Sequence, residues 1–108
     1  MQALPILAWI FTALLAVLLI VCVAAGRGAI PKNHFAGIRL PALMQSESAW
    51  RAGHRAGTLP AAIALVVALA TSVIGISVPA VYWATIAAFV IGVVCVFIVA
   101  TRAAASAA

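Results

Sequence analysis

Acidic side chains are almost missing from this chain, whose 108 residues include no aspartate and one glutamate, Glu47. A pair of catalytic carboxylates is therefore impossible within one subunit, and a Ser–His–Asp triad would need Glu47 in place of the aspartate. The two cysteines lie in apolar runs, and His34 and His54 are far apart in the sequence without a ligand-like spacing. We therefore predict no catalytic residue, no cofactor and no metal site.

Charge of either sign is also scarce, because charged residues make up 6% of the chain and hydrophobic residues 69%. A soluble domain of this size exposes too much of its surface to hide so many apolar side chains. Three apolar stretches, 3–25, 59–76 and 80–101, are long enough to cross a bilayer and contain no Asp, Glu, Lys, Arg or His. The first stretch is longer than the core of a signal peptide and lacks its basic leader. We predict an all-α membrane protein, a single membrane domain over 1–108 with three transmembrane helices.

Five of the six basic residues lie between positions 27 and 55, in the loop 26–57 that joins the first two spans. The positive-inside rule then predicts a multi-pass protein of the inner (plasma) membrane, with a cytoplasmic loop and C-terminus and an outer N-terminus. Trp9, Tyr82 and Trp83 would lie toward the outer interface, and Trp50 would lie at the inner one.

The basic loop contains signals for two pieces. Pro31 and Pro41 bracket an irregular segment, whose apolar side chains we expect to dip toward lipid. Ser46 is a suitable N-cap for a short interfacial amphipathic helix over about 47–56, with Glu47 in its first turn. Gly57 would end this helix, and the next helix would then begin as the second span.

The arginines of this loop predict anion binding. Arg51 and Arg55 are four residues apart, so on a helix they share one face and repel each other unless an anion lies between them. Polybasic segments beside a span gain about 1 kcal/mol per basic residue from an anionic membrane surface. The alternative, that these charges only fix the topology, is compatible with this role. No separate basic domain exists to sit on a nucleic acid duplex.

A set of loop residues resembles a known family. The order Asn33, Gly37-Ile38-Arg39, Pro41, Ser46, Trp50, His54-Arg55 and Gly57 is similar to the loop of the SdpI family of small bacterial membrane proteins. Here the last glycine follows Arg55 one residue sooner than in the family pattern. By this resemblance the residues expected to carry function are Asn33, Gly37, Arg39, Trp50, His54 and Arg55, and the anion argument adds Arg51.

The resemblance implies a non-enzymatic integral membrane protein. The founding member confers immunity on cells that secrete a killing toxin and signals by holding a transcriptional repressor at the membrane; it is longer, with more spans and another domain. Two other functions stay open. Small residues in the spans would suit an accessory subunit of a larger membrane complex, and an oligomeric transporter or channel is disfavoured by the absence of charge at membrane depth. Expected partners are anionic headgroups of the inner leaflet and other membrane proteins or further copies of the chain.

Overall fold

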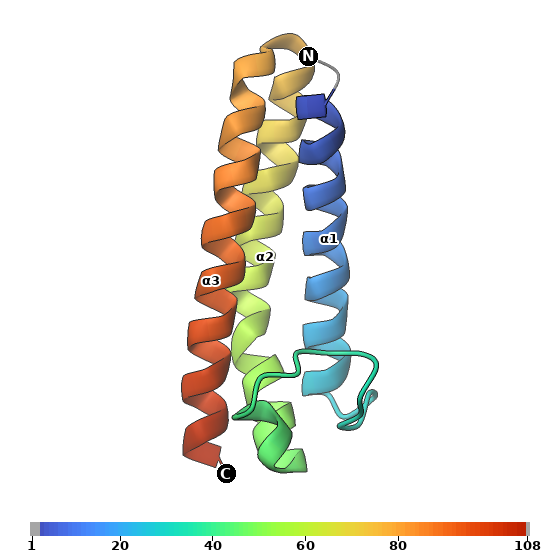
Figure 1. Cartoon of the computed structure of the whole chain (residues 1–108), viewed down its shortest axis with the longest axis vertical. Coiled ribbons are helices and arrows are strands. Elements are labelled where there is room, and N and C mark those ends of the chain that lie inside the picture. Colours follow the sequence, from blue (N-terminus) through green and yellow to red (C-terminus); the bar gives the residue numbers. More distant parts are fainter. Residues whose placement is uncertain (1–2, 108) are drawn as a thin grey trace.

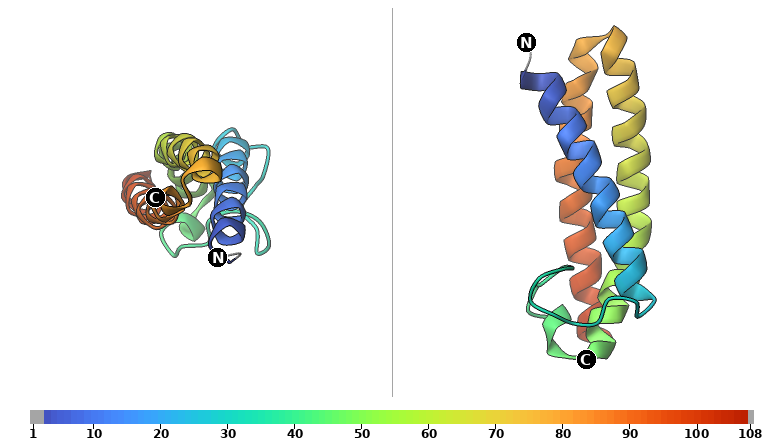
Figure 2. Two further views of the ribbon diagram at one scale, coloured as in Figure 1. Left: turned by 90° about the horizontal axis from the view of Figure 1, so that it is seen from above. Right: turned by 90° about the vertical axis from the view of Figure 1, so that its right-hand side faces the viewer.

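Three long helices make up the computed structural model, which describes residues 3–107 (Figure 1). They are α1 (Ala3–Gly26), α2 (Glu47–Ser77) and α3 (Tyr82–Ala107), with the short 3-10 turns η1 (Leu43–Gln45) and η2 (Pro79–Val81) between them. The helices pack as a triangular bundle with extents of 46 × 21 × 19 Å, in which α1 crosses the α2–α3 pair obliquely (Figure 2). The predicted all-α class is confirmed.

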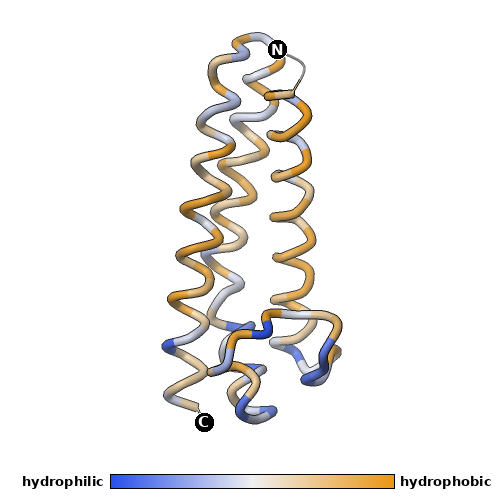
Figure 3. Tube along the Cα trace, in the orientation of Figure 1, coloured by the Kyte–Doolittle hydropathy of each residue, from blue (hydrophilic) through white to orange (hydrophobic). Residues whose placement is uncertain are grey.

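Each of the three helices is long and apolar enough to cross a membrane. At 1.5 Å per residue, the 24 residues of α1 extend about 36 Å, which exceeds the roughly 30 Å of a hydrocarbon core. Hydrophilic residues gather where the segment 27–46 and the C-terminus lie, whereas the N-terminus is at the other end (Figure 3). We call the former the loop end of the bundle. The chain is therefore a multi-pass membrane protein.

The prediction of a separate interfacial helix over 47–56 is wrong. Helix α2 runs without interruption from Glu47 through Gly57 and Pro60 to Ser77. Gly57 lies inside the helix because it is buried where the three helices meet, and a Cβ there would be 3.1 Å from Val96 and 3.4 Å from Cys22 Sγ. This packing overrides the weak helix propensity of glycine. The predicted N-cap is confirmed, since Ser46 Oγ accepts the Ala49 N–H at 3.0 Å.

Small residues bring the helices close together within the chain. A Cβ at Gly75 would lie 2.6 Å from the Tyr82 ring, and one at Gly92 would collide with Ala64. Such close approach is typical of membrane helices, where packing rather than the hydrophobic effect holds helices together. Some of the small residues that would suit contact with a larger complex are thus used within the chain, between α2 and α3.

Four hydroxyl groups join all three helices in the half of the bundle away from the loop end. Thr12 Oγ1 of α1 lies 3.0 Å from Ser72 Oγ of α2, and Thr85 Oγ1 of α3 lies 2.8 Å from Thr71 Oγ1 and 3.3 Å from Ser72 Oγ. Thr12 and Thr71 also donate to backbone carbonyls of Ala8 and Val67. In a bilayer these hydroxyls have no water as an alternative partner. The network therefore fixes the register of α1, α2 and α3.

We predict that Thr85→Val lowers the thermal stability of the protein in detergent. The substitution keeps the shape of a fully buried side chain but removes two interhelical contacts, each worth on average about 0.6 kcal/mol in a membrane protein. The matched control is Thr101→Val on the exposed part of the same helix. Equal melting temperatures for the two variants would contradict the role given to the network.

Candidate recognition site at the loop end

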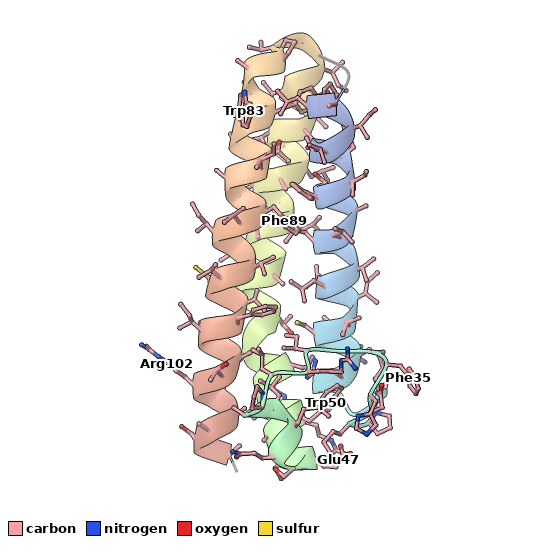
Figure 4. All side chains as sticks on the ribbon, viewed as in Figure 1. Phe35, Glu47, Trp50, Trp83, Phe89 and Arg102 are labelled. Atoms are coloured by element: carbon pink, nitrogen blue, oxygen red, sulfur yellow. The ribbon has the colours of Figure 1, made fainter. Side chains whose placement is uncertain are left out.

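The segment 27–46 folds across the loop end of the bundle instead of lying free beside it (Figures 1 and 4). Ile38 is 5% exposed, and Leu43 is fully buried against Gly53 of α2. The expectation that the apolar side chains of this segment dip toward lipid is therefore wrong for these two residues. They extend the protein core, because α2 begins well before the apolar stretch 59–76 and this first part of the helix offers them an apolar surface.

A turn centred on Asn33 shapes the outer part of this segment. Asn33 Oδ1 accepts the backbone N–H groups of Phe35 and Ala36, both at 2.8 Å, and its amide nitrogen donates to the carbonyl of Pro31. This side chain thus substitutes for backbone partners, as Asn commonly does in turns. Phe35 is left 95% exposed at the turn (Figure 4).

Trp50 anchors the segment to α2. Its side chain is fully buried, and its Nε1–H donates to the carbonyl of Ile30 at 2.8 Å. Gly37 rests on the indole with φ of 104°, and a Cβ there would lie 2.6 Å from Trp50 Cζ2 and 3.0 Å from His54 Nε2. Only glycine meets both demands, a left-handed backbone and no side chain. Trp50 lies at the opposite end from Trp83, as predicted, but it is a core residue and not an exposed interfacial anchor.

His54 connects the loop to α2 through both ring nitrogens. The Ile38 N–H donates to Nε2 at 2.8 Å, so Nδ1 carries the proton and donates to the carbonyl of Trp50 at 2.7 Å. The ring also lies against the Trp50 indole, with centroids 4.3 Å apart and a tilt of 52°. Burial lowers the pKa of His54 below its ordinary value, against the opposing effect of its bond to Trp50. The neutral imidazole is the form that fits these two hydrogen bonds. His54 lies in the part of α2 that precedes the apolar stretch 59–76.

The arginines of the predicted site do not form one cluster. Arg39 donates to the carbonyl of His34 and lines a groove of about 430 Å³ between α1 and α3. Arg55 donates to the carbonyl of Gly26, the last residue of α1, at 3.0 Å, and lines a crevice between α1 and α2. Arg51 lies on the same side as Arg55, with its guanidinium against Gly28.

The structure therefore separates the predicted residues into a buried core and a charged surface. Buried Trp50 and His54 form the core, and half-buried Gly37 rests on them; we call these three residues the loop clasp, and Asn33 shapes the turn beside it. Sequence reasoning missed the backbone partners of the clasp, the Ile30 carbonyl and the Ile38 N–H, since backbone groups leave no mark in a residue pattern. It also missed the exposure of Phe35.

A comparison with known families covers this same part of the chain. The model of the SdpI/YfhL protein family matches residues 29–101, which include most of the loop segment, all of α2 and most of α3. The chain belongs to the SdpI/YfhL protein family. The resemblance read from the loop residues is thus confirmed. Comparisons with curated proteins and with solved structures give no match. Of the six residues that the resemblance singled out in this SdpI/YfhL chain, four build the clasp and its turn.

We predict that Gly37→Ala destabilises the loop clasp more than Gly28→Ala does. Both glycines have positive φ, 104° and 83°, so each alanine carries backbone strain of about 1–3 kcal/mol. Only at Gly37 would the new Cβ also strike Trp50, because neighbours of Gly28 begin at 3.4 Å. Thermal unfolding in detergent measures the difference. A Gly28→Ala protein as destabilised as Gly37→Ala would show that the indole contact is unimportant.

We predict that the loop clasp opens as the pH falls below the ordinary histidine pKa. Because the folded state holds the pKa of His54 below 6.5, the unfolded clasp binds more protons, and stability present above pH 6.5 is lost as the pH falls toward the folded pKa. Protonated Nε2 could no longer accept the Ile38 N–H.

Hydrogen exchange of the Ile38 amide, followed by NMR in micelles between about pH 7 and pH 5, measures this opening. His34→Gln is the control, because it removes the exposed histidine and should leave the pH dependence unchanged. Protection of Ile38 that stays constant over this range in the wild-type protein would refute the mechanism.

Proposed function

We propose that this chain is a non-enzymatic immunity or signalling protein of the bacterial inner membrane. Its loop end faces the cytoplasm in this proposal, because the basic residues of the first loop follow the positive-inside rule. The loop end would recognise a partner in the membrane or at its surface. Membership of the SdpI/YfhL protein family supports the general class, and the geometry of the loop supports recognition as the task.

The observation that carries this proposal is the exposed aromatic residue on a firmly held turn. Phe35 is 95% exposed, although its own N–H is bonded to Asn33 and the segment behind it is fastened to α2 by the loop clasp. Large aromatic side chains held in one place are common anchors of protein interfaces. A rigid loop also loses little entropy when it binds, because its conformation is already fixed.

The chemistry of the loop end favours binding over catalysis. Both ring nitrogens of His54, one of the two histidines, are engaged in hydrogen bonds, and its side chain is fully buried. A general base must reach a proton of the substrate. Glu47 is engaged too, since its Oε1 accepts the Lys32 N–H at 3.0 Å.

A survival assay tests the proposal. Sensitive bacterial cells that express the chain should survive a membrane-active peptide toxin better than cells with an empty vector, and Phe35→Ala should reduce this protection without lowering the melting temperature. Arg39→Ala should act similarly, because it alters the same exposed loop. Trp50→Ala should lose both protection and stability, because it removes the buried anchor.

The matched control is Val94→Ala, which shortens an exposed apolar side chain on α3. It should retain full protection. If expressing cells die like those with the empty vector across a panel of membrane-active toxins, the immunity role is rejected. Protection that is equal in wild-type and Phe35→Ala cells would reject Phe35 as the recognition residue.

A further inference from the structure

A crevice between α1 and α2 at the loop end is not used by the loop clasp. It has a volume of about 230 Å³ and is lined by Cys22, Val23, Gly26, Arg27, Arg55 and Thr58. A second hollow of about 710 Å³ lies on the adjoining face of α1 and shares Val23 and Arg27 with the crevice. Its other walls are Leu19, Ile20, Ala24, Gly28 and Ala29. The two hollows together join a basic pocket to an apolar surface.

Three arginines gather around the end of α1 beside this crevice. Arg27 follows the last residue of the helix, and Arg55 donates to the carbonyl of Gly26. The guanidinium of Arg51 lies against Gly28, where a Cβ would be 3.4 Å from its Cζ. Arg27 and Arg55 line the crevice and Arg51 lies beside it, so charges from α2 and from the residue after α1 surround residues 26–28.

Within residues 3–107, no carboxylate pairs with these arginines. Glu47, the one carboxylate side chain, accepts the backbone N–H of Lys32 on the loop. The bond from Arg55 to Gly26 uses one of five guanidinium donors. Arg51 and Arg55 are also like charges four residues apart on one helix, an arrangement that destabilises the helix unless it is offset. An anion with several acceptor oxygens would offset this repulsion, and a phosphate has that chemistry.

We propose that this crevice binds an anionic phospholipid, with its phosphate among Arg27, Arg51 and Arg55 and an acyl chain along the α1 face beside Val23. The apolar hollow favours a lipid over a soluble phosphate. This hollow continues from the basic crevice along a side of α1 that a membrane would cover. Ile20 on this face is 66% exposed. The proposal is independent of the immunity role, since it concerns lipid bound to the purified protein.

Native mass spectrometry of the detergent-solubilised protein tests this site. The probes are phosphatidylglycerol and phosphatidylcholine, added at equal concentration. Wild-type protein should retain the anionic lipid preferentially, and Arg27→Gln/Arg51→Gln should reduce that preference by roughly fivefold per arginine removed. Arg55 is left in place because it also bonds to α1. A micelle of neutral detergent has no charged bilayer surface, so this measurement reports the protein site alone.

The matched control is Arg102→Gln, which removes the same charge at the loop end but from α3, where the side chain points away from α1 and α2 (Figure 4). It should keep the preference for phosphatidylglycerol. Arg27→Lys/Arg51→Lys should retain part of the preference, and it provides a charged variant if the glutamine variant does not fold.

Three outcomes would overturn the proposal. One is equal retention of the two lipids by wild-type protein, and another is an equal loss of preference in Arg102→Gln and in the crevice variant. The third is displacement of the bound lipid by millimolar inorganic phosphate, which would assign the pocket to a soluble phosphate compound. The readout contains no toxin, so a failure of the immunity role leaves the lipid result unaffected.

Discussion

The neutral imidazole of His54 is the constraint on which the loop end depends. One ring nitrogen accepts the Ile38 N–H of the loop, and the other donates to the carbonyl of Trp50 one turn earlier on α2. A buried polar group without a partner costs about 1–3 kcal/mol of stability. Loss of either bond therefore destabilises the packing of the whole segment on α2. Each partner is a backbone group, and this requirement fixes where the loop passes over the helix.

The loop clasp makes different demands on each of its members. The indole of Trp50 supplies apolar surface and a bond to the Ile30 carbonyl, and Gly37 is required because any Cβ would occupy the space of that indole. The chain must then leave the clasp through the turn at Asn33, which places Phe35 outside. A rigid exposed turn thus follows from a buried contact, although residues 27–42 form no helix or strand.

Composition was enough to predict the architecture, because three long uncharged stretches have few solutions in a bilayer. The predicted break at Gly57 was wrong, since a glycine in a local pattern signals a helix end whereas this one serves a contact with Val96 and Cys22. The loop residues of the candidate site were identified by resemblance, but their arrangement was not. The path of the loop across the bundle decides which groove each arginine lines. This path cannot be predicted from the spacing of residues in the sequence.

The distinction between buried and exposed residues changes what the family pattern means. Trp50 and His54 are buried and Gly37 packs closely on both of them, so folding alone dictates the type of these three residues. A shared clasp therefore establishes a shared loop shape, and a defect after substitution in the clasp reports a lost shape as readily as a lost contact. Under the proposed recognition role, specificity would lie in residues outside the clasp, such as Phe35 on the turn and Arg51 beside the α1 end.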